Sequence, residues 1–356
     1  MNKSVTTRQL AVITTVGFTI TKLHILPASL SHFSSEALWL SALINIIIDF
    51  LLLLAVLKIT SNAKNENIIL CFENKFGKTF TKILCFLYVL FFMLKTFIPI
   101  YEQKNSIELT FYETQPTFLT FMPFFIVAFY IVLKGVRPYA RSMEISLWIF
   151  ILGITIIFLL SAFSGSYSTL LPIIPNNASF LNGSFKSLIW FGDPLLLLFF
   201  TGKIERSKNH NKKIIIAYIV YAVVTLAFLI VFYSIFDTIA ERQYYASLKM
   251  SKYSISLSDI GRFDYLGAFL LSGINVFQVC LPLIFSSILL SYCFNFKNKI
   301  IPALIVVLIQ VVFSILTQND FFKSLSFIQN YAVYFFILMT YLTPLIILLK
   351  RRKNGI

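Results

Sequence analysis

The chain has 356 residues, of which 58% are hydrophobic, 17% aromatic and only 13% charged. Soluble domains carry about a quarter charged residues, and a water-soluble chain of this size could not bury so much apolar surface in one core. The composition therefore excludes an ordinary soluble protein and indicates a membrane protein. The formal net charge of +15 would suggest nucleic acid binding in a soluble chain, so its meaning depends on where the charges lie.

Ten apolar stretches are long enough to cross a bilayer as helices, which takes roughly 17 to 25 mostly apolar residues. They lie at about 9–31, 38–58, 81–101, 115–133, 143–163, 182–202, 214–236, 265–293, 301–318 and 329–349. Runs such as 44–57 do not alternate as the strands of a membrane β-barrel do. The first stretch has no Ala-x-Ala cleavage pattern, so we expect it to be retained. We predict one all-α polytopic membrane domain over residues 1–356, with ten transmembrane helices.

The Lys and Arg residues are distributed unequally between alternate loops. Twenty-one lie on the side of the N-terminus and the tail, and seven lie in the loops of the other side. Because cytoplasmic loops carry an excess of cations, both termini are predicted to be cytoplasmic. The net charge is then a signal of topology with attraction to anionic lipid head groups, and no nucleic acid partner is expected.

Four charged residues fall inside the predicted spans: Lys22, Asp49, Lys95 and Asp193. An ionised side chain at mid-membrane costs about 2.5 to 3.5 kcal/mol, so each should face a partner or a wet cavity. The two lysines either extend along their stems to the outer head groups or pair with Asp193 or a ligand carboxylate. Asp49 is either neutral or hydrogen-bonded to another helix.

The sixth stretch contains the sequence Trp-Phe-Gly-Asp-Pro at 190–194. Pro194 lacks an amide hydrogen, clashes with the carbonyl of Trp190 and pushes Asp193 away from helical angles, whereas Gly192 tolerates almost any backbone. The sequence predicts a break near the middle of this span, or alternatively a simple kink healed by a neighbouring helix.

The first stretch carries a polar, glycine-containing stripe of Thr14, Thr15, Gly17, Thr19 and Thr21. Threonines in membrane helices often bond only to their own backbone. If the ten helices form two five-helix halves, at about 9–163 and 182–349, the first and sixth spans occupy corresponding positions. Interrupted helices at such positions are typical of transporter-type binding sites.

Several short segments in this order resemble the spore germination receptor B-subunit family, a branch of the amino acid/polyamine/organocation transporter superfamily. They are Thr-Arg-Gln-Leu at 7–10 before a first span that ends at Leu-Pro (26–27), Lys-Gly-Val (134–136) through Ala-Arg-Ser-Met-Glu (140–144), Leu-Leu-Pro-Ile at 170–173 with Phe-Gly-Asp at 191–193, Arg-Phe-Asp-Tyr-Leu at 262–266, and Phe-Asn-Phe-Lys at 294–297. Residues 17–22 depart from the family, which typically has a Gly-x-Gly-type segment there.

The resemblance implies a 5+5 inverted-repeat transporter-type fold with broken helices 1 and 6. It also implies a role in sensing a small nutrient, commonly an amino acid, in the inner membrane of endospores. The A and C subunits of a germination receptor, the second of them a lipoprotein, would be partners.

In such a fold, backbone groups at the broken helices and side chains from spans 3 and 8 would bind the ligand. The predicted ligand-binding residues are Thr19, Thr21, Lys22, Lys95, Phe191, Gly192, Asp193, Asn275, Phe277 and Gln278. Lys22 or Lys95 would attract a carboxylate, and Asp193 would hold an ammonium group or pair with a lysine. Asn275 and Gln278 share a helix face and have helix–helix bonding as an alternative role.

No catalytic triad, phosphate-binding loop or metal-ligand spacing occurs in the sequence, and the three histidines are scattered. We therefore expect neither an enzyme nor a cofactor. Two other functions stay open: an ion-coupled amino acid transporter, and a scaffolding subunit without a pocket. The outer loop at 237–264 is expected to be either a solvated connector or a gating or partner-contact element.

Overall fold

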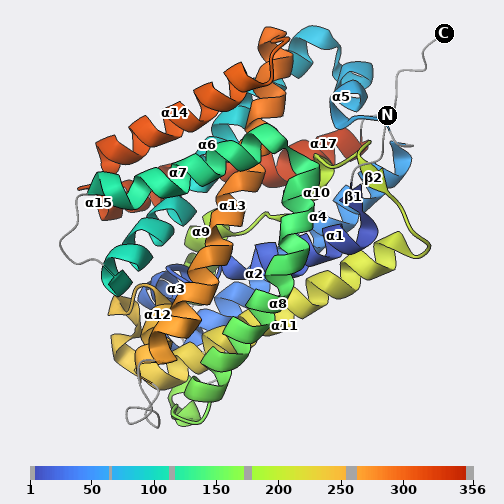
Figure 1. The fold of residues 1–356 in the computed structure, drawn as a ribbon. Helices are drawn as coiled ribbons and strands as arrows, with labels where there is room; N and C mark the ends of the chain where they lie inside the picture. Colours follow the sequence, from blue (N-terminus) through green and yellow to red (C-terminus); the bar gives the residue numbers. More distant parts are fainter. Residues whose placement is uncertain (1–4, 64–65, 112–116, 172–178, 254–262, 350–356) are drawn as a thin grey trace.

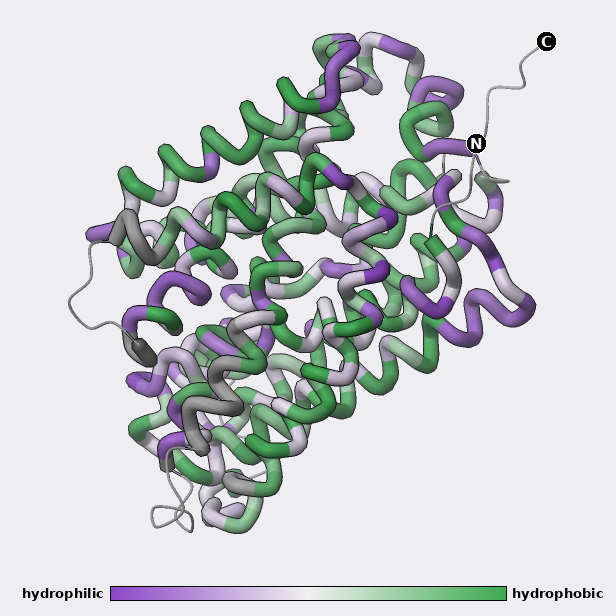
Figure 2. The backbone as a smooth tube through the Cα atoms, viewed as in Figure 1, coloured by the Kyte–Doolittle hydropathy of each residue, from purple (hydrophilic) through white to green (hydrophobic). Residues whose placement is uncertain are grey.

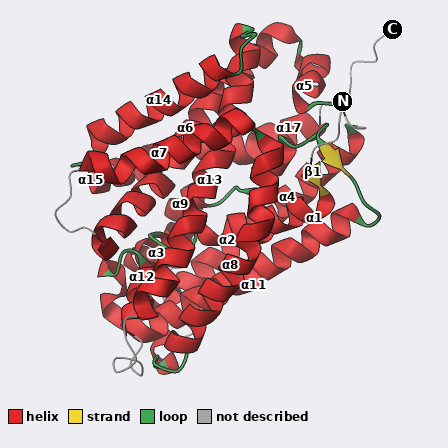
Figure 3. Cartoon of the chain, in the orientation of Figure 1, coloured by secondary structure: helices red, strands yellow, loops and turns green. Residues whose placement is uncertain are grey.

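The computed structural model describes residues 5–63, 66–111, 117–171, 179–253 and 263–349, and these are almost entirely helical (Figures 1 and 3). The elements in chain order, with η marking 3₁₀ or π turns, are β1 (Val5–Thr6), α1 (Thr7–Val12), η1 (Ile13–Gly17), α2 (Phe18–Ile20), α3 (Leu26–Ser34), η2 (Ser35–Ala37), α4 (Leu38–Asn62), α5 (Ile68–Phe76), α6 (Lys78–Phe111), α7 (Thr117–Lys134), α8 (Val136–Ser161), η3 (Tyr167–Leu170), α9 (Ser179–Ser187), η4 (Leu188–Trp190), α10 (Pro194–Leu198), β2 (Ile204–Glu205), α11 (His210–Phe236), η5 (Asp237–Arg242), α12 (Ala246–Tyr253), α13 (Phe263–Phe294), α14 (Ile300–Thr317), α15 (Phe321–Phe327), η6 (Ile328–Ala332), α16 (Val333–Ile337), η7 (Leu338–Leu342) and α17 (Thr343–Leu349).

Hydrophobic residues predominate along the helices of the bundle, while hydrophilic segments gather near β1 and at helix ends (Figure 2). Large apolar residues such as Trp148 and Leu316 are 68% and 76% exposed, which suits contact with lipid rather than water. Seven helical segments are long and apolar enough to span a membrane: Leu26–Asn62, Lys78–Asn105, Val136–Leu159, His210–Arg242, Gly273–Phe294, Ile300–Thr317 and Phe321–Leu349. The chain is a multi-pass membrane protein.

The remaining predicted spans correspond to shorter or interrupted helices. The stretch at 115–133 contains the apolar helix Phe121–Lys134, and the stretches at 9–31 and 182–202 are broken in the middle. Within the described ranges, seven helical segments long enough to span a membrane are therefore found where ten stretches were predicted. The count of ten and the division into two inverted halves stay predictions.

The first break is defined here as residues 21–25, between α2 and α3. A π turn, η1, already loosens the preceding helix, and Pro27 starts the next one. The freed backbone groups find partners elsewhere. Ala246 and Ser247 of α12 donate to the carbonyls of His24 and Leu23 at 2.9 and 3.0 Å, and the part of the outer loop at 237–253 is thus a packed element rather than a solvated connector. Residues 254–262 of that loop lie outside the described residues.

The second break is defined as residues 191–193, between η4 and α10. Gly192 has a φ of 82°, a left-handed conformation that favours glycine, and Pro194 begins α10. This is the break that the Gly-Asp-Pro sequence predicts. α10 packs beside α4, so the second break lies against a continuous helix.

A short parallel strand pair joins the start of the first broken span to the segment that follows the second. Val5 of β1 pairs with Ile204 of β2, and Thr6 pairs with Glu205. Thr6 and Gln9 form a capping box that starts α1. The Thr7 hydroxyl donates to the carbonyl of Glu205 at 3.2 Å. The two broken spans are therefore connected at their β1–β2 ends.

Candidate ligand-binding site

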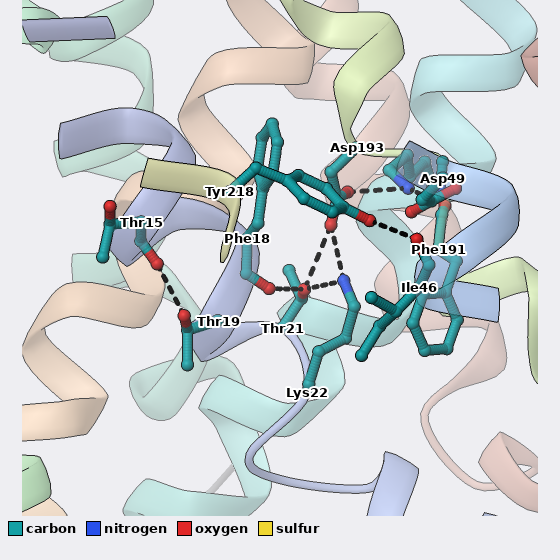
Figure 4. Close-up of polar contacts among 12 residues, drawn as sticks. Thr15, Phe18, Thr19, Thr21, Lys22, Ile46, Asp49, Phe191, Asp193 and Tyr218 are labelled. Carbon is teal, nitrogen blue, oxygen red and sulfur yellow. Dashed lines mark hydrogen bonds and ion pairs between the residues drawn. The ribbon is translucent and has the colours of Figure 1, made fainter. Parts of the chain in front are cut away.

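The two breaks meet at a buried cluster of three charged side chains, of which Figure 4 labels Lys22 and Asp193. Lys22 Nζ lies 2.5 Å from Asp193 Oδ2, and Lys95 Nζ of α6 lies 2.9 Å from Asp193 Oδ1. The side chains of Lys22, Lys95 and Asp193 are only 0%, 8% and 3% exposed. Of the two alternatives for the lysines, extension to the head groups is therefore wrong for both, and pairing with Asp193 is found.

Backbone and aromatic groups complete the surroundings of the two ammonium groups. Lys95 Nζ donates to the carbonyl of Phe191 at 2.7 Å, and Lys22 Nζ donates to the Thr21 hydroxyl at 2.5 Å. Lys22 Nζ also lies 5.1 Å from the centre of the Phe191 ring and 5.7 Å from that of Tyr221, where the ring faces attract a cation. Both lysine Nζ atoms therefore have the hydrogen-bond acceptors that a buried ammonium group requires.

Asp49 of α4 supports the second break rather than entering the charge cluster. Its two carboxylate oxygens accept the Gly192 N–H at 3.0 and 2.8 Å, and the Tyr341 hydroxyl donates to Oδ1 at 2.7 Å. The hydrogen-bonding alternative for Asp49 is thus the one found. In this position it receives a backbone donor that the broken helix leaves without an intrahelical partner.

A narrow cavity with about 570 Å³ of empty volume opens between the broken spans, α6, α8 and α13. Its charged lining residues are Lys95 and Asp193, and the polar groups of Thr21, Trp190 and Gln278 also face it. The rest of the wall is mainly apolar and includes the Phe18 and Tyr139 rings. A concave, mostly apolar pocket with a few convergent polar groups is the usual form of a small-molecule site.

Two polar side chains in the wall lack hydrogen-bond partners within the described part of the chain. The Nε1 of Trp190 and both amide atoms of Gln278 are buried and unpaired. Buried polar groups are normally satisfied, so these three atoms are available to a bound molecule. The sequence analysis included Gln278 but missed Trp190, although it immediately precedes the predicted break.

The structure brings four of the ten predicted residues, Thr21, Lys95, Asp193 and Gln278, to the cavity wall. Lys22, Phe191 and Gly192 form the layer behind them through the contacts described above. The other three predicted residues do not reach the wall: the Thr19 hydroxyl donates to the Thr15 carbonyl at 2.6 Å, Asn275 Nδ2 donates to the Pro99 carbonyl at 3.3 Å, and the Phe277 ring packs against Tyr139. Asn275 therefore has its alternative role, bonding between helices.

Glu102 directly follows the apolar stretch predicted at 81–101, yet it is buried inside the helix bundle. α6 continues to Phe111, and Glu102 lies on it with 0% exposure. Its Oε1 accepts the Ile25 N–H at 3.1 Å. Glu102 is thus a fifth charged residue at the centre of the molecule, next to the first break. The signal that could have found it is that α6 stays helical beyond its apolar stretch.

Comparison with known sequences identifies the family. The sequence profile described as spore germination protein, of the spore permease family, matches residues 4–322. No curated protein sequence matches significantly.

Comparison with solved structures identifies the fold. Mutants of the manganese transporter of Eremococcus coleocola superpose with a TM-score of 0.65 at 13% identity, over 95% of this chain and 77% of theirs. The structure of MhsT in complex with L-phenylalanine gives a TM-score of 0.62 at 13% identity, over 96% and 97%. At this identity the likeness concerns the fold alone. By the profile match over residues 4–322, the chain belongs to the spore germination protein family.

Proposed function

We propose that this protein is the nutrient-sensing membrane subunit of a spore germination receptor, and that it binds a small ligand such as an amino acid in the cavity between the two breaks. The observation that carries the proposal is the Lys22–Asp193–Lys95 cluster. One carboxylate joins the first broken span, the second broken span and α6. A ligand that changes any of these contacts changes the relative positions of three helices. A receptor needs only a ligand that binds one of two conformations more tightly than the other.

The position of Lys95 in the cluster favours a ligand with a carboxylate. Two lysines share Asp193, and both oxygens of Asp193 are already engaged. A ligand cation would have to displace a lysine, whereas a ligand carboxylate meets the ammonium group of Lys95 at the cavity wall. The unpaired Trp190 N–H and the Gln278 amide supply further hydrogen bonds, and the apolar wall accepts an apolar side chain.

The remaining parts of the proposal follow from the family and the sequence. The chain lies in the spore inner membrane with both termini cytoplasmic, and its helices form two inverted five-helix halves. The A and C receptor subunits are its protein partners. Membership in the spore germination protein family supports this assembly. The similarity in fold to the solved structures described above supports the inverted halves.

Ligand binding is tested with the purified full chain and a panel of amino acids, by thermal stabilisation. One compound should stabilise the wild type, while Lys95→Met and Gln278→Leu should weaken its binding by at least tenfold. Lys186→Gln, which removes a charge in the last turn of α9 outside the cavity wall, is the matched control and should bind normally. Equal binding by Lys95→Met and wild type would contradict the proposed site.

A scaffolding subunit makes a different prediction in spores. If the chain only supports its partners, Lys95→Met leaves the nutrient concentration dependence of germination unchanged while the complex remains abundant. A shifted concentration dependence at normal abundance supports the receptor.

An ion-coupled amino acid transporter is the second candidate, because one similar solved structure is a manganese transporter and another is in complex with L-phenylalanine. Uptake of the radiolabelled ligand into proteoliposomes that contain only this chain separates the two functions. Concentrative uptake driven by a proton or sodium gradient would establish transport and overturn a purely sensory role. Binding without uptake would support the receptor.

A further inference from the structure

A second cavity lies away from the charge cluster, where the end of α7, the start of α8, the end of α13 and the start of α14 come together. Its empty volume is about 1040 Å³. The helices around it are mutual neighbours, since α13 packs against α7, α8 and α14, and α14 packs against α7. In the proposed topology this cavity opens at the cytoplasmic membrane surface.

Four basic side chains line this cavity, namely Lys134, Arg137, Lys203 and Lys299. Among the described residues, the wall contains no Asp or Glu. Lys134, Arg137 and Lys299 are exposed and make no ion pair with a described carboxylate. Lys134 instead lies over the Tyr130 ring, 5.2 Å from its centre. Burial of Lys203 and the positive charge of Lys299 both lower the pKa of the Lys203 ammonium. Lys134, Arg137 and Lys299 therefore leave positive charge at the wall that an anion would neutralise.

Two polar features point into the same space. Gly135, with a φ of 80°, precedes α8, whose N-terminus has no side-chain cap and presents backbone N–H groups that favour an anion. Ser287 is only 8% exposed, and its hydroxyl has no hydrogen-bond partner within the described residues. A phosphate oxygen would satisfy both the hydroxyl and the helix end.

The rest of the wall is apolar, which separates a lipid from a free anion. Val132, Val136, Ile284, Ile288 and Pro302 line the cavity between the cations and the helix bundle. The neighbouring outward faces of the first turns of α14 are apolar and exposed, with Ile300 at 51% and Leu304 at 42%. A lipid whose phosphate group lies among the cations could thus place its acyl chains along this apolar surface.

We infer that this cavity binds the phosphate head group of one anionic membrane phospholipid, with its glycerol and upper acyl chains along the apolar wall. Basic pockets between helices on the cytoplasmic side have the chemistry for such head groups. Because the same pocket borders α13, which also supplies Gln278 to the ligand cavity, lipid occupancy would fix one wall of the site where the nutrient is proposed to bind.

The test uses the purified full chain in nanodiscs of phosphatidylcholine, with or without phosphatidylglycerol, and counts retained lipid by native mass spectrometry. The wild type should retain one phosphatidylglycerol in preference to phosphatidylcholine. The triple variant Lys134→Gln, Arg137→Gln, Lys299→Gln should lose this preference, with about a fivefold weaker retention for each charge removed. Equal retention of both lipids by the wild type would overturn the inference.

A matched control removes the same charge from the same side of the membrane. Lys58→Gln, Lys208→Gln, Lys212→Gln changes three exposed lysines outside the cavity wall and should retain the lipid. Equal loss in both triple variants would mean diffuse attraction to the surface and would overturn the inference. If the first triple variant does not fold, the single variant Lys299→Gln should show the fivefold loss, and Lys299→Arg should restore retention.

Free phosphate is the other source of the same chemistry. Inorganic phosphate and glycerol phosphate, added at millimolar concentration, should neither displace the lipid nor stabilise delipidated protein. If either one binds with the affinity of phosphatidylglycerol, the site takes a soluble anion and the lipid assignment fails.

Discussion

The first and second breaks each leave a backbone N–H without its helical partner, and in each a buried carboxylate from a long neighbouring helix accepts it. Glu102 of α6 accepts Ile25, and Asp49 of α4 accepts Gly192. The two carboxylates differ in what else they bind. Asp49 also receives the Tyr341 hydroxyl, whereas Oε2 of Glu102 has no partner in the described part of the chain.

This difference indicates which break is the more rigid. At the second break a saturated carboxylate, a glycine in the left-handed region and a proline fix the backbone together. At the first break, Pro27 also starts the following helix, but a half-satisfied carboxylate and backbone contacts to α12 hold a segment without a left-handed glycine. We expect ligand-dependent movement to occur at the first break, with the second as its fixed partner.

The largest effect is expected from Asp193→Asn, because this change removes the carboxylate that pairs with both Lys22 and Lys95 and leaves two buried lysines sharing a neutral amide. Breaking such a pair costs about 3 to 5 kcal/mol, measured as loss of thermal stability of the purified chain. Adding Lys22→Met removes one unpaired charge and should restore a large part of the loss. A double variant no more stable than Asp193→Asn would show that the cluster is not the link between the breaks.

Gly192→Ala should be next, with a loss of at least about 1 to 2 kcal/mol from the left-handed backbone alone. A Cβ there would lie 2.2 Å from Thr340 Cγ2, which adds a steric cost. Gly17→Ala in the first broken span is the control, since its Cβ would meet nothing closer than 3.8 Å. Circular dichroism melting of both variants checks the contrast, and equal losses would contradict the assignment of rigidity to the second break.

Asp49→Ala should cost about 1 to 3 kcal/mol, because the Gly192 N–H and the Tyr341 hydroxyl lose their acceptor. Tyr341→Phe removes only one of these bonds and should cost less. Hydrogen exchange around residues 188–196 gives a local reading that a general loss of stability would not reproduce. Unchanged exchange at Gly192 in Asp49→Ala would show that this carboxylate does not hold the second break.

Glu102→Gln should have the smallest effect, below about 1 kcal/mol, because the amide oxygen can still accept the Ile25 N–H and Oε2 has no partner to lose. The measurement is the same thermal melt. A loss as large as that of Asp49→Ala would mean that the charge of Glu102 matters, and that the two breaks are more alike than their contacts suggest.

The second break was predictable because its cause is local: Gly192 and Pro194 impose it on the backbone. Asp193 and the two lysines were predictable as a cluster only in part, since the cost of buried charge requires partners but does not choose among them. Glu102 could not be assigned from hydropathy, because the polar residues after 101 end the apolar stretch while α6 continues as a helix. Trp190 and Tyr139 reach the cavity through packing between distant segments, which no local pattern contains.

The β1–β2 pair joins Val5 and Thr6 to Ile204 and Glu205 by backbone pairing. The ends of the two broken spans are therefore expected to move as one unit. If the first break bends, the segments beyond it toward β1 cannot swing alone without breaking these hydrogen bonds. Motion at the proposed ligand cavity would instead move β1 and β2 together, as a single displacement. A subunit docked at that end of the molecule would then sense one mechanical output from two separate helices.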